Sequence, residues 1–446
     1  MPNKVAFNED YPIVTQSDKL YERALPIMTP VTQTLAKGPG QYINGVAPKY
    51  LRRGKGSHVW DVDGNEFLDY NMAIGPLSLG YCYRRVDEAI IEQLKDGITF
   101  SMMHELEVVL AELIHDIIPN AEAIRISKTG ADVTSAAIRV ARAYTGRKKV
   151  LCCGYHGWHD WYISVTSRSS GIPEEVKELT STFEYNDLDS VRNALDEDVA
   201  CVILEPFVFE APKDNFLQHL KDLCDANGTL LIFDEMWTGF RIALGGAQEY
   251  FNVTPHLACY SKAFANGMPI SLLTGRKDIM DMFREEVFFF TTFGGEALSL
   301  AAAIATIQEM REKKVPDWLA EKGKRLKDGY NILAADLDIA HYTKCTGYDC
   351  RSLVSFDATA GNPLELKSFV QQELIKRGIL WSGFHNMSFS HTDADVDYTL
   401  AAYREVLGLL KDAVSRREIS SLLRGKSIEP VFRKVSNFNT KPVSKS

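Results

Sequence analysis

The chain has 446 residues, of which 45% are hydrophobic and 24% charged, and its formal net charge is -9. This length exceeds what one hydrophobic core usually supports, so we expect at least two domains, and the ordinary composition excludes a largely disordered chain. The negative charge argues against a general nucleic-acid-binding surface, which needs a basic stripe. No signal-peptide core, long apolar run or CxxC pair occurs, which predicts a cytoplasmic protein with no membrane segment and no zinc site.

The N-terminal part contains strand and helix signals in succession. GSHVWDVDGNEFLDY, residues 56–70, has the pattern of two short strands around an Asp-Gly turn. Helical spacing of apolar residues follows at 86–94 and at 106–117. We expect residues 1–70 to pack with a smaller C-terminal domain and residues 71–312 to form the large domain.

From residue 124 onward, short apolar runs alternate with helical segments, which is typical of parallel strands joined by crossover helices. The predicted strands are 123–127, 149–153, 200–204, 229–233, 257–261 and 270–275. Polar residues follow most of these runs. In open α/β sheets, ligands bind beyond the carboxyl ends of the strands, so we expect a site at this edge.

The C-terminal part changes character after a helical run at 298–311 and Pro316. Residues 313–425 have the mixed pattern of a smaller α+β domain, and residues 426–446 form a polar tail. The predicted fold class is therefore α/β, with a large domain whose central sheet is mainly parallel and flanked by helices, plus the smaller α+β domain.

Two residues at the expected sheet edge carry candidate chemistry. Asp234 follows the apolar run TLLIF and is either a capping or salt-bridged acid, or a carboxylate held opposite a cationic ring nitrogen. Lys262 follows another strand among small residues; it is either a surface lysine or an amine that forms a Schiff base. Gly130 opens a helix with small early residues, whose N-terminal N–H groups suit a phosphate. Together these three describe a site for pyridoxal 5'-phosphate (PLP).

Several blocks resemble class III aminotransferases, and in particular the glutamate-1-semialdehyde aminomutase branch. They are GSHVWDVDGNEFLDY, the TGAD turn, GYHGWHD, LLIFDEMWTGFRIALGGAQEYFNVTP, YSKAFANGMP and TTFGGEALSLAAA. The resemblance extends from about residue 35 to residue 410. It implies PLP-dependent transferase fold type I, PLP as cofactor, and a homodimer with shared active sites.

The resemblance also implies roles for individual residues. Lys262 matches the lysine that binds the cofactor, and Asp234 matches the partner of the pyridine nitrogen. Met236 and Tyr155 match the residues on the two faces of the ring. The phosphate turn corresponds to Thr129, Gly130 and Ala131, and Thr292 matches the threonine that reaches the phosphate of the neighbouring subunit. Glu205 matches a glutamate near the cofactor, although a structural carboxylate is an equally open interpretation.

Three departures from the family pattern concern the substrate. The stretch QYINGVAPKYLR has no counterpart of the family's arginine for a substrate carboxylate. Glu296 stands in TTFGGEA where the family has asparagine, and His385 stands in a shortened C-terminal motif where the aminomutases have glutamate. Glu296, His385 and His156 are therefore candidate substrate contacts. His156 and His159 lack further metal ligands, so a role in the fold or behind the cofactor is favoured over a metal site.

The sequence thus predicts a PLP-dependent aminotransferase that moves an amino group, from L-glutamate as the expected donor, to an aldehyde or ketone. The missing arginine favours an acceptor without a carboxylate there, such as a carbohydrate-like carbonyl compound. The alternatives are an aminomutase that returns the amine to the same skeleton, another PLP enzyme such as a decarboxylase or epimerase, and a catalytically silent binding protein. A nicotinamide enzyme is disfavoured because no GxGxxG follows the first strand of the α/β region.

Overall fold

The computed structural model describes residues 8–207 and 210–429. Within them the chain forms two compact units, one made of residues 8–83 and 317–429 and the other of residues 84–316. The sequence placed these divisions at residues 70 and 312, so the large unit begins later along the chain than expected. The predicted tail, 426–446, lies outside the described residues from residue 430 onward.

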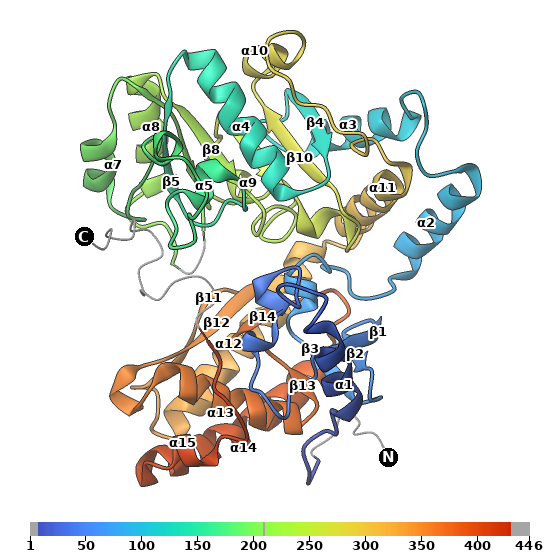
Figure 1. Cartoon of the computed structure of the whole chain (residues 1–446), viewed down its shortest axis with the longest axis vertical. Helices are drawn as coiled ribbons and strands as arrows, with labels where there is room; N and C mark the ends of the chain where they lie inside the picture. The colour runs from blue at the N-terminus through green and yellow to red at the C-terminus, as the bar shows by residue number, and fades with distance from the viewer. Residues whose placement is uncertain (1–7, 208–209, 430–446) are drawn as a thin grey trace. The chain divides into compact units, whose positions relative to one another are not determined.

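The unit of residues 84–316 is organised around a seven-stranded sheet with strand order β4-β10-β9-β8-β7-β5-β6 (Figure 1). β10 is antiparallel to both of its neighbours, and the other six strands run in one direction. The predicted α/β class with a mainly parallel central sheet is therefore confirmed. The strands are β4 (Ala123–Ser127), β5 (Lys149–Cys153), β6 (Thr180–Thr182), β7 (Val199–Leu204), β8 (Leu230–Asp234), β9 (Leu257–Tyr260) and β10 (Ser271–Gly275).

Helices flank this sheet because its central strands are apolar on both faces. β7, β8 and β9 are buried along their whole length, as parallel strands covered on both sides are. Helix α4 packs Val133, Ala137 and Val140 into the core that also contains Ile203 and Ile232. The helices of this unit are α2 (Arg84–Asp96), α3 (Glu105–Ile117), α4 (Gly130–Thr145), α5 (Asp160–Ile163), α6 (Glu174–Lys177), α7 (Leu188–Ala194), α8 (Phe216–Asn227), α9 (Ala247–Tyr250), α10 (Lys277–Met280) and α11 (Ala297–Glu312).

Six strands agree closely with the predicted runs, with two differences. β10 was expected among the parallel strands but runs in the opposite direction, because a short connection from β9 leads into it. β6 was not predicted; it is a three-residue edge strand beside β5. The carboxyl ends of β4, β5, β7, β8 and β9 consequently lie at one edge of the sheet.

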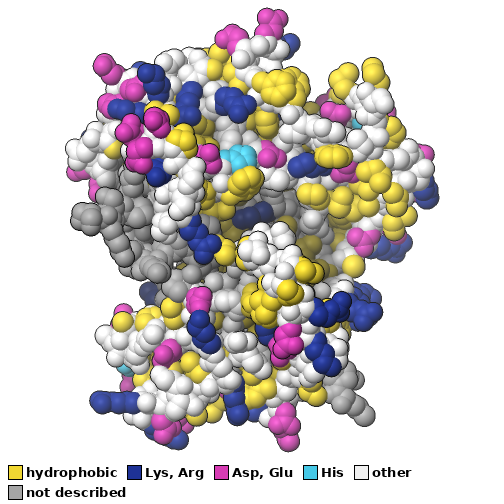
Figure 2. All heavy atoms as spheres, in the orientation of Figure 1, with side chains coloured by type: hydrophobic (Ala, Val, Ile, Leu, Met, Phe, Trp, Pro, Cys, Tyr) yellow, Lys and Arg dark blue, Asp and Glu magenta, His cyan; other side chains and the backbone are white. Residues whose placement is uncertain are grey.

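The surface of this unit exposes an unusual number of large apolar side chains around α2 and α3. Figure 2 shows them gathered over these helices and the loop between them. They are Ile91, Leu94, Ile98, Phe100, Met102, Met103, Val108 and Val109. Among the described residues, no helix is both long and apolar enough to cross a membrane. The cytoplasmic location stays a prediction.

The other unit combines the N-terminal segment with the C-terminal part of the chain. One sheet has the order β1-β2-β3-β13 and a second has the order β11-β12-β14. The two chain segments are joined by the parallel pairing of β13 with β3. They also share a core that includes Ile43, Phe67, Ile375 and Leu380. The strands are β1 (Leu51–Lys55), β2 (His58–Asp61), β3 (Glu66–Asp69), β11 (Thr343–Tyr348), β12 (Arg351–Phe356), β13 (Ile379–Leu380) and β14 (Phe384–Asn386). The helices are α1 (Thr15–Ala24), α12 (Val315–Asp336), α13 (Pro363–Lys376), α14 (Asp393–Arg416) and α15 (Ile419–Leu422).

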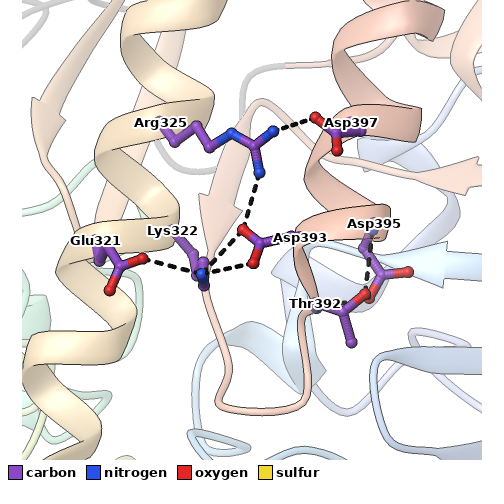
Figure 3. A network of polar contacts seen from close by, with 7 residues as sticks. All are labelled: Glu321, Lys322, Arg325, Thr392, Asp393, Asp395 and Asp397. Atoms are coloured by element: carbon purple, nitrogen blue, oxygen red, sulfur yellow. Dashed lines mark hydrogen bonds and ion pairs between the residues drawn. The ribbon is translucent and has the colours of Figure 1, made fainter.

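A polar network connects α12 to the N-terminus of α14 (Figure 3). Lys322, whose side chain is buried, donates to both carboxylate oxygens of Asp393 at 2.9 and 3.0 Å. Thr392 caps α14: its hydroxyl accepts from the N–H of Asp395, and the Asp395 carboxylate accepts from the N–H of Thr392. This reciprocal capping satisfies N–H groups that a helix start otherwise leaves without partners.

Replacing Thr392 by alanine removes the cap of α14. We expect Thr392→Ala to lower the free energy of unfolding by about 1 kcal/mol, because the first turn loses a side-chain acceptor. Urea denaturation followed by circular dichroism measures the change. Ser415→Ala, an exposed position near the other end of the same helix, is the matched control; equal losses in both variants would contradict the capping role.

Candidate active site

Asp234 is the last residue of β8, and its side chain is held inside the protein at the sheet edge. Only 1% of the residue is exposed. Its Oδ1 accepts from the backbone N–H of Met236 at 3.1 Å, and its Oδ2 lies 2.7 Å from Nδ1 of His156. A buried carboxylate needs such partners, and these two fix its direction.

His156 stands behind this carboxylate. Its Nε2 lies 3.1 Å from the carbonyl oxygen of Cys153, so both ring nitrogens face oxygen acceptors. A ring nitrogen that carries a proton donates to the oxygen it faces, so the proton on Nδ1 points at the Asp234 carboxylate. His156 is 2% exposed and packs on Trp161 and Tyr162. The geometry therefore gives it contact with Asp234 in place of the predicted substrate contact.

Tyr155 and Glu205 lie next to this pair, after β5 and β7. The Tyr155 ring is partly exposed and packs edge-on against Tyr162, with 5.4 Å between ring centroids. Its backbone N–H donates to Glu205 Oε2 at 2.9 Å. Burial, followed by the negative charge of Asp234, raises the pKa of Glu205. Gly154 is required here, because its φ is 110° and a Cβ would lie 2.6 Å from the Glu205 carboxylate.

The N-terminus of α4 follows β4 at the same edge. Thr129 is the N-cap: its hydroxyl accepts from Asp132 N–H, and the Asp132 carboxylate accepts from Thr129 N–H. Gly130 and Ala131 are the next two residues, and the N–H groups of a first helical turn have no partner within the helix. Such N–H groups bind phosphate.

Close approaches join this turn to the neighbouring segments. A Cβ on Gly130 would lie 2.8 Å from Met236 Sδ, and a Cβ on Gly157 would lie 2.8 Å from Ala131 Cβ. The hydroxyl of Thr134 also donates to the carbonyl oxygen of His156 at 2.8 Å. The predicted phosphate turn, Met236 and the Tyr155–His156 segment are therefore brought together.

Lys262 follows β9 and begins the short helix η4 (Lys262–Ala265). It has a φ of 53°, in the left-handed region that a non-glycine residue seldom adopts, and strain of this kind gathers at functional sites. Its Nζ lies 3.4 Å from the centroid of the Trp237 ring. The contact with Trp237 was not predicted, because no local pattern tells which strand-end residue a tryptophan will contact.

Two further predicted residues lie near the start of α11. Glu296 is its N-cap and accepts from the N–H groups of Leu298 and Ser299, the Ser299 hydroxyl and Lys128 Nζ. These bonds occupy the carboxylate, so the structure gives it a structural task in place of the predicted substrate contact. Thr292 is exposed between the exposed Phe290 and Phe293.

His385 lies in the other unit, in β14. It is fully buried, with Nδ1 2.9 Å from Ser352 Oγ and Nε2 2.7 Å from the Tyr403 hydroxyl. Burial lowers its pKa to about 3. The expectation of a substrate contact rested on its place in a sequence motif, whereas the structure makes it a core residue of this unit.

The residues at the sheet edge fit PLP. Asp234 is a buried carboxylate that suits a ring nitrogen, and Lys262 carries an amine. Tyr155 has an aromatic face and Met236 an apolar side chain that suit a ring, and the N-terminus of α4 has N–H groups that suit a phosphate. In residues 8–207 and 210–429, no group of three or more His, Cys, Asp or Glu side chains could hold a metal ion.

Comparisons with known proteins show the family of this chain. The family model described as Aminotransferase class-III matches residues 43–388. The 3-aminobutyryl-CoA aminotransferase of Cloacimonas acidaminovorans is 34% identical over 411 residues, covering 89% of this chain and 98% of that protein. A glutamate-1-semialdehyde 2,1-aminomutase 2 of Halalkalibacterium halodurans is 35% identical over 396 residues, which cover 82% of this chain and 92% of that protein. The FumI protein of Sphingopyxis sp. MTA144, solved in its PLP internal aldimine form, is 30% identical with a TM-score of 0.83, covering 92% of this chain and 98% of that one. The chain therefore belongs to the class III aminotransferase family of PLP-dependent enzymes.

Proposed function

We propose that this enzyme transfers an amino group from L-glutamate to an aldehyde or ketone, with Lys262 and Asp234 as its catalytic residues. The observation that carries the proposal is the buried Asp234 carboxylate, fixed by His156 and Met236 N–H at the edge where Lys262 and the α4 N-terminus also lie. An ionised carboxylate opposite a pyridine nitrogen, with an amine nearby, is the minimal arrangement for amine transfer through PLP.

PLP supplies an electron sink when it is bound. Lys262 Nζ would hold the cofactor through its amine, and the same amine would carry a proton to and from the substrate carbon. Its Nζ lies 3.4 Å from the centroid of the Trp237 ring, a cation–π contact that orients the lysine side chain at the sheet edge. The Asp234 carboxylate would face the pyridine nitrogen and favour its protonated form.

The other predicted contacts orient the cofactor. Gly130 and Ala131 offer backbone N–H groups to the phosphate, with Thr129 holding the turn in shape. Tyr155 and Met236 cover the two faces of the ring. Glu205, whose pKa is raised, fixes the Tyr155 backbone through its hydrogen bond.

The acceptor is proposed to lack a carboxylate at the position that the family's arginine serves. Arg241 is the other arginine near this site, but it is 1% exposed and its Nε donates to the carbonyl oxygen of Trp237 at 3.0 Å. This hydrogen bond occupies part of its guanidinium group, which supports an acceptor without a carboxylate at this position. A carbohydrate-like aldehyde or ketone fits these constraints.

An aminomutase is the second candidate, because relatives named glutamate-1-semialdehyde 2,1-aminomutase are up to 35% identical to this chain. In that reaction the amine returns to the substrate's own skeleton. Turnover that needs no separate amino donor would favour the aminomutase, whereas a strict requirement for a donor favours the transferase.

The proposed homodimer rests on the apolar surface around α2 and α3. Eight large apolar side chains there are between 41% and 86% exposed, and a contiguous patch of this kind marks an interaction site. Phe288, Phe290 and Phe293, which flank Thr292 in sequence, are also more than half exposed. We propose that a second copy of the chain covers this surface and that Thr292 reaches the phosphate of the partner.

The visible absorption spectrum tests both L-glutamate as the amino donor and Lys262 as the residue that binds PLP. We expect purified protein to show the absorption band of lysine-bound PLP and L-glutamate to remove it, while Lys262→Ala never shows that band because no side-chain amine is available. A band that glutamate leaves unchanged would contradict the proposed donor. A band of normal intensity in the variant would contradict the role of Lys262.

Removing the support behind Asp234 should weaken the site. We expect His156→Leu to reduce PLP affinity by roughly tenfold, since a buried carboxylate that loses a hydrogen-bond partner costs about 1–3 kcal/mol. Fluorescence titration of the apo-protein measures this. His219→Leu, an exposed histidine on α8, is the control; identical affinities for both variants would rule out the supporting role of His156.

A charge within the apolar surface tests the dimer. We expect wild-type protein to sediment as a dimer of two 50.0 kDa chains and Phe293→Asp to shift it toward monomer, because the introduced carboxylate loses its water in the interface. Analytical ultracentrifugation gives the masses. Ile332→Asp, at an exposed apolar position on α12, should leave the mass unchanged. A monomeric wild type would contradict the proposal.

A further inference from the structure

A charged pair lies directly beside the proposed phosphate turn. Lys128 immediately precedes Thr129, and its Nζ lies 2.9 Å from Glu296 Oε2. The two side chains are only 17% and 11% exposed. This degree of burial separates the pair from the solvent-exposed ion pairs of the chain, which contribute little to stability.

Glu296 connects this lysine to two other segments. Its Oε1 accepts from Leu298 N–H at 2.7 Å at the start of α11, and its Oε2 accepts from the Ser299 hydroxyl at 2.6 Å. Ser299 Oγ also lies 3.2 Å from the carbonyl oxygen of Pro269, in the segment that follows Lys262. One carboxylate therefore links the strand-end turn after β4, the first turn of α11 and the chain between β9 and β10.

The surroundings of Glu296 favour its ionised form. Burial alone raises the pKa of Glu296, but hydrogen bonds from Ser299 and Lys128 outweigh it and hold the pKa below its usual value. Removing one member of a partly buried pair leaves the charge of the other without a partner. Removing both members leaves no unpaired charge. The two residues should consequently act as a unit.

The sequence around the pair points to what it does. Lys128 stands at the start of the phosphate turn, and Glu296, which stands where the family pattern has asparagine, caps α11. We infer that Lys128 and Glu296 form a positioning pair that holds the Thr129–Ala131 turn against α11, so that its backbone N–H groups would point at the PLP phosphate. This inference rests on the proposed phosphate role of the turn.

A double-mutant cycle tests the pair through cofactor affinity, with no need for turnover. Apo-protein is titrated with PLP and with pyridoxal, which lacks the phosphate, for wild type, Lys128→Met, Glu296→Gln and the double variant. We expect each single variant to raise the Kd for PLP about tenfold and the double variant to raise it by no more than either single one. The Kd for pyridoxal should change less than twofold. Lys149→Met, which breaks an exposed ion pair with Asp196, is the control.

Other outcomes would contradict either the positioning pair or the phosphate role of the turn. The positioning pair would be overturned if the single variants had the same Kd for PLP as Lys149→Met. It would also be overturned if the losses of PLP affinity were additive in the double variant, or if pyridoxal affinity fell as much as PLP affinity. A wild type that binds PLP no better than pyridoxal would overturn the phosphate role of the turn instead. If a single variant fails to fold by circular dichroism, Lys128→Arg and Glu296→Asp replace it; both keep the charges, and we expect them to restore PLP affinity to within threefold of wild type.

Discussion

The hydrogen bond between His156 Nδ1 and the Asp234 carboxylate, 2.7 Å long and closed to solvent, is the interaction on which the site depends. A carboxylate buried without partners costs several kcal/mol, so Asp234 is stable at the end of β8 only because His156 and Met236 N–H compensate it. His156 is itself fixed by the carbonyl oxygen of Cys153 at the end of β5. The bond therefore connects two strands that β7 separates in the sheet, and it keeps the charge of Asp234 aimed in one direction.

The parallel sheet explains why the remaining groups are available at the same place. Strands that run in one direction end at one edge, and each is followed by a segment free to carry a functional group: Lys128 to Ala131 after β4, Tyr155 and His156 after β5, Glu205 after β7, and Lys262 after β9. The core beneath them is apolar and closely packed, so the positions of these segments are set by the rigid strands. A cofactor with a ring, a phosphate and an aldehyde needs groups from several segments, and this edge supplies them.

Local patterns in the sequence were sufficient to predict six of the seven strands of the large sheet and the polar residues directly after them. Asp234 and Lys262 were predicted because a buried strand and a following polar residue are adjacent in the chain. The direction of β10 and the contacts of Glu296, His385 and Trp237 were not predictable in this way, because each depends on residues far away in sequence. Glu296 and Lys128 are 168 positions apart, and no single-sequence pattern relates them. His385 occupies a motif position that resembles a substrate contact, yet its hydrogen bonds to Ser352 and Tyr403 place it in a core.

The most direct test of this account is to locate the covalent attachment of the cofactor. The PLP-loaded protein is reduced with borohydride and digested, and the modified peptide is identified by mass spectrometry. The account predicts one phosphopyridoxyl group, on Lys262 within YSKAFANGMP, in amounts that match the bound PLP. A modification on any other lysine, or bound PLP that leaves Lys262 unmodified, would contradict the site built around Asp234 and Lys262.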